Sequence, residues 1–183
     1  MKIPFVNYPK LYLEARDKYL NLIDSIFSKG GFIMQSELDN FERELSTFLN
    51  SNFSIGVGNA TDGLEIALMS LNLKPGDEVI CSAHTMVATA SSIKMAGATP
   101  KIVDIGADNL IDPDAISEAI NSRTVGIMPT QLNGRTCNMD NIMNIAEKNK
   151  LFVVEDAAQA LGSKFNEKNA GTFGIASAIS FYP

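Results

Sequence analysis

The stretch Leu151-Phe-Val-Val-Glu155-Asp156-Ala-Ala-Gln159-Ala-Leu-Gly162 carries the clearest signal for the fold of this chain. Its four leading apolar residues, two of them β-branched, predict a strand that is buried on both faces. This strand ends in two adjacent carboxylates, at the position where an open parallel sheet binds its ligands. Neighbouring strand residues point to opposite faces, so only one of Glu155 and Asp156 should face a ligand. A second interpretation stays open, in which the two acids cap a following helix or pair with a basic side chain.

Alternating strands and helices are expected on both sides of this stretch. The first 52 residues predict a helical segment, with Ser36 as the N-cap of its second helix. From residue 53 the pattern predicts strands at 53–57, 78–81, 100–104, 125–128, 151–155 and 176–181. The intervening helices are expected at 62–71, 85–96, 113–120 and 139–149, the third starting at Asp112-Pro113. Residues 53–183 therefore predict an α/β fold with a mainly parallel sheet flanked by helices.

Composition excludes several classes of function. The 183 residues carry a net charge of −6 and no cluster of Lys and Arg, which argues against a nucleic-acid partner. Cys81 and Cys137 lack the spacing of a disulfide framework or a zinc site, and one histidine, His84, predicts no metal centre. No segment has the pattern of a signal peptide or the apolar length of a membrane span, so a cytoplasmic protein without a membrane partner is expected.

A small-residue loop, Gly56-Val-Gly58-Asn-Ala60-Thr61-Asp-Gly63, follows one expected strand and opens a helix. Small residues allow close approach of the backbone, and the helix N-terminus offers unpaired amides to a phosphate. Thr61 adds a hydroxyl group. The loop lacks the third glycine of a dinucleotide fingerprint and the lysine of a P-loop, so a single phosphate fits best. A tight turn with an Asn or Thr cap is the alternative.

Further polar and soft side chains are expected at the same edge of the sheet. Gln159 follows Asp156 by three residues at the expected helix start, and Met86 lies at another junction between a strand and a helix, with Thr85 as its cap. Ser180 is near the end of the last strand. His84 is interpreted as local packing or a surface turn. A phosphate site, a place for a flat ring and a carboxylate for its protonated nitrogen suit pyridoxal phosphate.

At these residues the chain resembles the DegT/DnrJ/EryC1/StrS family, the sugar aminotransferases of the type I pyridoxal-phosphate fold. An ordered series of motifs carries the resemblance from end to end: Ile3-Pro4-Phe5, Gly31-Phe-Ile33, Phe41-Glu42, Gly58-Asn-Ala-Thr-Asp62, Pro75-Gly-Asp-Glu-Val79, Thr85-Met-Val-Ala-Thr89, Gly97-Ala-Thr-Pro100, Val154-Glu-Asp-Ala-Ala-Gln159 and Ser180-Phe-Tyr-Pro183.

The resemblance implies a role for each cofactor-binding residue. Ala60 and Thr61 would hold the cofactor phosphate together with Ser180. Asp156 would pair with the pyridine nitrogen, and Gln159 would lie near the ring hydroxyl.

Other positions depart from the family pattern. Met86 stands where the family usually places an aromatic ring over the cofactor. Met34-Gln35, Gln131 and Asn133 replace a Gly-containing turn, a His and a Tyr. These last changes are expected where a sugar approaches.

The family pattern continues beyond Pro183 to a Schiff-base lysine at position 185. The resemblance therefore implies a truncated large domain, with the lysine and the small C-terminal domain absent from this sequence. The expected protein is a homodimeric aminotransferase that transfers an amino group, with glutamate as the expected donor, to a nucleotide-linked keto sugar for amino-sugar or polysaccharide biosynthesis. A keto-sugar 3-dehydratase with histidine at position 185 is the alternative within the fold. A non-catalytic phosphate- or nucleotide-binding module is the alternative for a chain that ends at 183, and a nicotinamide-dependent oxidoreductase is disfavoured.

Overall fold

The computed structural model describes residue 4 and residues 6–181, and the chain divides into two compact units between Glu44 and Leu45. The motif residues Ile3, Phe5, Tyr182 and Pro183 lie outside the described residues.

Helix α1 (Tyr8–Phe27) forms most of the first unit, and helix α2 (Ser36–Leu49) begins there. The Asn7 side chain caps α1 by accepting from the Lys10 amide. Ser36 was expected to cap α2, but it is already the first helical residue, and the Gln35 carbonyl accepts from the amides of Leu38 and Asp39. No residue of α1 is buried.

The second unit is built on a parallel five-stranded sheet in the order β2-β1-β3-β4-β7. The strands are β1 (Glu78–Ser82), β2 (Thr99–Val103), β3 (Thr124–Met128), β4 (Phe152–Asp156) and β7 (Ala176–Ala178). The predicted α/β class with a mainly parallel sheet is confirmed. Two short strands, β5 (Lys164–Phe165) and β6 (Lys168–Asn169), form a separate antiparallel hairpin.

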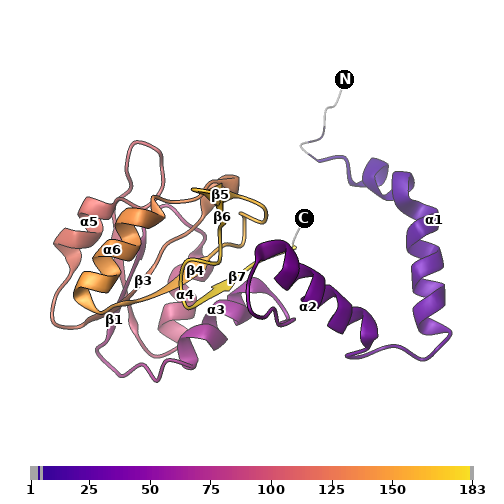
Figure 1. Ribbon diagram of the computed structural model, residues 1–183, viewed down its shortest axis with the longest axis horizontal. Helices are drawn as coiled ribbons and strands as arrows, with labels where there is room; N and C mark the ends of the chain where they lie inside the picture. Colours follow the sequence, from indigo (N-terminus) through magenta and orange to yellow (C-terminus); the bar gives the residue numbers. More distant parts are fainter. Residues whose placement is uncertain (1–3, 5, 182–183) are drawn as a thin grey trace. The chain divides into compact units, whose positions relative to one another are not determined.

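Four helices cover the two faces of this sheet, α3 (Ala60–Met69) and α4 (Val87–Met95) on one, α5 (Pro113–Ala119) and α6 (Met139–Asn149) on the other (Figure 1). The α5 start is as predicted: Asp112 caps it by accepting from the Asp114 amide, and Pro113 takes the first helical position. Helix α4 begins two residues later than expected, because Met86 keeps an extended backbone and serves as its N-cap.

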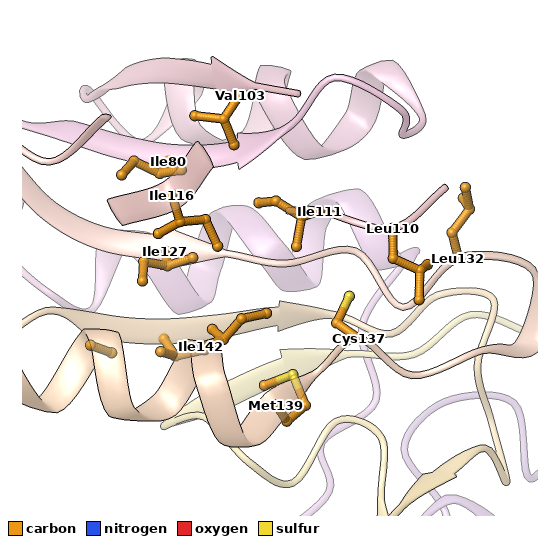
Figure 2. Close-up of a cluster of buried hydrophobic side chains, with 12 residues drawn as sticks. Ile80, Val103, Leu110, Ile111, Ile116, Ile127, Leu132, Cys137, Met139 and Ile142 are labelled. Atoms are coloured by element: carbon orange, nitrogen blue, oxygen red, sulfur yellow. The ribbon is translucent and has the colours of Figure 1, made fainter. Parts of the chain in front are cut away.

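Alternate residues of the central strands β1, β3 and β4 divide the core into two layers. Ile80, Ile127 and Val153 contribute to one cluster with α5 and α6, which also holds Cys137 and Met139 (Figure 2). Their strand neighbours Val79, Met128 and Val154 join a second cluster, with residues of α3 and α4. This alternation is the reason that each central strand reads as a continuous apolar run.

The strand expected at 53–57 is wrong, since these residues pair with no strand in the described part of the chain. Phe53 and Ile55 remain 83% and 79% exposed. An alternating apolar pattern becomes a strand only where a neighbouring strand completes its hydrogen bonds. The last strand also ends earlier than expected, at Ala178.

Candidate active site

The carboxyl ends of the parallel strands bring the predicted polar residues to one edge of the sheet. Asp156 ends β4, and its backbone forms a bridge to Thr130, which follows β3. The Gln131 amide donates to the Asp156 carbonyl (2.9 Å), and the Asp156 amide donates to the Pro129 carbonyl (3.0 Å). Residues about 25 positions apart in sequence are thereby fixed side by side, as the crevice rule for parallel sheets predicts.

The two adjacent carboxylates of β4 point in opposite directions and have different environments. Asp156 accepts from the Thr89 hydroxyl (2.5 Å) and the Ala158 amide (3.2 Å). Glu155 instead accepts from the Gln131 side chain and from three amides of the segment 171–174. Both carboxylate oxygens of Glu155 therefore accept their hydrogen bonds from donors within the protein. Asp156 is therefore the acid that remains for a ligand.

Asp156 is 4% exposed and belongs to no ion pair within the described residues. Burial raises the pKa of its carboxyl above the usual value, while the hydrogen bonds from Thr89 and Ala158 act in the opposite direction. A buried carboxylate without a cationic partner is costly unless a ligand supplies the positive charge. A protonated ring nitrogen is such a ligand.

The N-terminus of α3 has the form expected of a phosphate site. Asn59 caps the helix: its side-chain oxygen accepts from the Asp62 amide (2.9 Å) and its carbonyl from the Gly63 amide (3.1 Å). The amides of Ala60 and Thr61 have no acceptor among residues 6–181. The Asn-capped turn that was the alternative interpretation is therefore present, and it leaves two amides available for an anion.

The first turn of α3 lies against the end of β7. A Cβ added to Gly63 would come within 3.2 Å of the Ala178 side chain. Ser180 follows Ala178 by two residues and is half-buried. A small residue at position 63 thus allows the helix start and the segment after β7 to approach each other, as a phosphate held by both requires.

Met86 and Gln159 follow β1 and β4, at the same edge of the sheet. Met86 is the N-cap of α4 and is 64% exposed, so its side chain is open to a flat ligand. The Gln159 side-chain oxygen accepts from the Asn133 amide (3.0 Å), which turns the NH2 group of Gln159 outward as a donor. No helix follows β4, contrary to expectation: residues 157–160 form a turn, closed by a hydrogen bond from the Ala160 amide to the Ala157 carbonyl.

Several other candidates have different positions from those expected. Gln131 does not line a sugar approach, because it is fully buried between Glu155 and the Cys137 amide. Asn133 is exposed with a left-handed backbone (φ +55°). His84 forms a hydrogen bond with the Asn109 carbonyl on the surface. Met34 and Gln35 belong to the first unit.

Sequence reasoning missed two threonines that contact the site, Thr89 and Thr130. Thr89 had a usable signal, since it follows Thr85 by four residues and therefore shares its face of a helix start. Thr130 had none, because only the pairing of β3 with β4 brings it to the site.

The described residues contain neither a group of metal ligands nor a membrane-spanning helix. His, Cys, Asp and Glu nowhere gather in a metal-binding group within residues 6–181. None of the helices in that range has the length and apolarity needed to cross a membrane.

Comparison with known proteins gives consistent matches. The sequence model described as the DegT/DnrJ/EryC1/StrS aminotransferase family matches residues 14–183. The dTDP-3-amino-3,6-dideoxy-alpha-D-galactopyranose transaminase of Aneurinibacillus thermoaerophilus is 37% identical and covers 98% of this chain. The chain spans about half the length of the curated relatives it matches.

Solved structures match as well. A crystal structure of S. venezuelae DesV in complex with a ketimine intermediate covers the whole chain with 34% identity and a TM-score of 0.94, and the chain covers 49% of it. A structure of NtdA from Bacillus subtilis with bound PMP covers 93% of the chain with 37% identity and a TM-score of 0.86, and the chain covers 40% of it.

Proposed function

The chain belongs to the DegT/DnrJ/EryC1/StrS aminotransferase family, and from this membership we propose that it is the N-terminal part of an aminotransferase that uses pyridoxal phosphate. The complete enzyme would transfer an amino group from glutamate to a nucleotide-linked keto sugar. It would act as a homodimer in amino-sugar or polysaccharide biosynthesis. Residues 53–183 would form part of its large cofactor-binding domain, preceded by the helical segment 1–52.

One observation carries the proposal: Asp156 is a buried carboxylate without a cationic partner in the described part of the chain, at the sheet edge where α3 presents two unpaired amides. The first feature suits a protonated ring nitrogen, and the second suits a phosphate. Pyridoxal phosphate carries both groups on one small molecule. The donors and acceptors of the chain therefore fit this cofactor.

Six residues of the chain have specific roles in this proposal. Ala60 and Thr61 bind the phosphate with backbone amides and a hydroxyl, and Ser180 adds a second hydroxyl. Asp156 holds a proton on the ring nitrogen through its negative charge. Met86 packs against the ring, and the Gln159 NH2 group donates to the ring hydroxyl. When bound, the cofactor supplies an electron sink for a substrate carbanion.

The proton transfers at the substrate carbon require a base, which we assign to a lysine at position 185. Histidine at this position would favour the dehydratase instead. Sequencing through position 185 of the complete gene separates these outcomes.

The test uses the complete protein. Purified enzyme should show the visible absorption of a lysine-bound pyridoxal, and glutamate should convert it to the near-ultraviolet absorption of the amine form. A panel of nucleotide-linked keto sugars should then restore the visible band with the matching substrate. Asp156→Ala should abolish both conversions, whereas Asp114→Asn, an exposed change on α5, should not affect them. A visible band that does not respond to glutamate would contradict the amino donor, and the absence of any bound cofactor would contradict the proposal.

A further inference from the structure

Three threonine hydroxyls from two segments, one at the start of α4 and one after β3, form a connected row that ends at Asp156. Thr130, which follows β3, lies 2.9 Å from Thr85, which precedes α4. Thr85 lies 2.6 Å from Thr89 in the first turn of α4, and Thr89 lies 2.5 Å from the Asp156 carboxylate, all measured between oxygen atoms. Thr89 and Thr130 are buried and Thr85 is half-buried.

The charge of Asp156 fixes the direction of every hydrogen bond in this row. An ionised carboxylate only accepts, so the Thr89 hydroxyl must donate to it. A hydroxyl has one proton, so the Thr89 oxygen can only accept from Thr85, and the Thr85 oxygen in turn accepts from Thr130. All three O–H dipoles therefore point toward the carboxylate. Aligned hydrogen bonds polarise one another, which strengthens the bond at the end of the row.

This row is the main support that the chain itself gives to a charge on Asp156. Burial disfavours the ionised form, and within residues 6–181 the carboxylate has one further polar contact, the Ala158 amide at 3.2 Å. Glu155 contacts donors on the opposite face of β4. The helices that pack around β4 and β7 carry titratable groups, none of which pairs with Asp156: Asp62 and Glu65 on α3, Lys94 on α4, and Asp140, Glu147 and Lys148 on α6.

We infer that Thr130, Thr85 and Thr89 form a one-way hydrogen-bond chain that keeps Asp156 ionised and correctly oriented for a cationic ring nitrogen. Thr89 and Thr85 are then positioning residues for the cofactor, and this role rests on the proposed function. The hydroxyl chain itself is independent of the cofactor, because it lies wholly within the protein.

The first measurement follows the Asp156 carboxyl in the cofactor-free form of the complete protein. Its 13C resonance, assigned by comparison with Asp156→Asn, is titrated in the wild type and in variants. Thr89→Val removes a hydrogen bond to a charged group, which should raise the pKa of the carboxyl by about one to two units. Thr85→Val should raise it less, and Thr89→Ser should restore the wild-type value.

Ser92→Ala is the matched control. It removes another buried hydroxyl from α4, one that donates to the Thr89 carbonyl and has no contact with Asp156. The pKa of Asp156 should be unchanged in this variant. If Thr89→Val does not fold, the half-buried Thr85→Val and the Thr89→Ser variant still carry the test.

The second measurement is the affinity for pyridoxamine phosphate, which forms no imine and so reports the ring and phosphate contacts alone. Thr89→Val should weaken binding about tenfold or more, as the loss of 1.4 kcal/mol implies. An unchanged pKa of Asp156 in Thr89→Val and Thr85→Val would overturn the hydroxyl chain even if the wild type binds the cofactor. If the pKa of Asp156 rises in these variants but the wild type binds no pyridoxamine phosphate, the hydroxyl chain is supported and the proposed cofactor is rejected.

Discussion

Glu155 offers a sharp test of the packing beneath the site. It is fully buried, and both of its oxygens accept hydrogen bonds from inside the protein. One oxygen accepts from the amides of Phe173 (2.6 Å) and Gly174 (2.9 Å). The other accepts from the Gln131 side chain (2.7 Å) and the Gly171 amide (2.8 Å). The Glu155 carboxylate thereby holds the segment 171–174, which lies just before β7 in the sequence.

Glu155→Gln keeps the shape of the side chain and replaces one acceptor oxygen with an NH2 group. Whichever way the amide turns, two buried donors then face another donor. Each unsatisfied buried donor costs about 1–3 kcal/mol, so the free energy of unfolding should fall by about 2–6 kcal/mol. This is a large part of the 5–15 kcal/mol that stabilises a typical domain.

Two measurements on the complete protein check this value. Urea denaturation should show the fall in the free energy of unfolding. Hydrogen exchange should speed up either at the amides of Phe173 and Gly174 or at the amide of Gly171, depending on which oxygen position the NH2 group takes. Glu118→Gln, an exposed change on α5, should stay within about 0.5 kcal/mol of the wild type. Unchanged exchange in the segment 171–174 of Glu155→Gln would refute the reasoning, because it would mean that Glu155 does not hold these amides.

Three further predictions concern the same unit of the chain. In Gly174→Ala the new Cβ would overlap the Val153 carbonyl, so the backbone must move. Urea titration should show that the free energy of unfolding falls by about 1–3 kcal/mol, and an unchanged midpoint of urea unfolding would contradict the close approach of Gly174 to Val153. Burial raises the pKa of Asp156 above 3.8, so the folded cofactor-free protein binds this proton more readily than the unfolded chain does. Its stability should therefore fall as pH rises from about 4 through the raised pKa, and Asp156→Asn should remove this fall; matching pH profiles of Tm for both proteins would argue against it. Burial also raises the pKa of Cys81 to about 11 and that of Cys137 to about 12, so iodoacetamide at neutral pH should modify neither thiol until the protein is unfolded; peptide mass spectrometry that finds native labelling would disprove their burial.

The adjacent carboxylates of β4 divide two tasks between the faces of one strand. The carboxylate of Glu155 accepts all its hydrogen bonds from the protein, including one from the Gly171 amide. The carboxylate of Asp156 accepts from one hydroxyl and one amide, and no cation in the described part of the chain pairs with its charge. The strand geometry enforces this division, because consecutive side chains leave a sheet on opposite sides. Two consecutive residues at the edge of a sheet can therefore have different roles, one stabilising the fold and the other remaining available to a ligand.

Much of the fold was predictable from local pattern. Helix α6 has the predicted bounds, α5 starts at the predicted Asp-Pro pair, and the first four strands, β1 to β4, lie within one residue of their expected ends. The failures share a cause. The strand at 53–57 lacks a pairing partner among the described residues, and the helix expected after Asp156 is a turn, so tertiary context rather than propensity decided both.

The sequence by itself determined the alternation of strands and helices, the capped turn at Asn59 and the acidic end of β4, because periodicity, caps and small residues act over a few positions. Only the tertiary structure decided that Asp156 faces the open edge while Glu155 is enclosed, that Gln131 is buried, and that Thr130 stands beside Thr85. These facts depend on strand order, since β3 had to lie between β1 and β4 before their ends could meet. Strand order is a property of pairings between distant segments, and no local pattern encodes it.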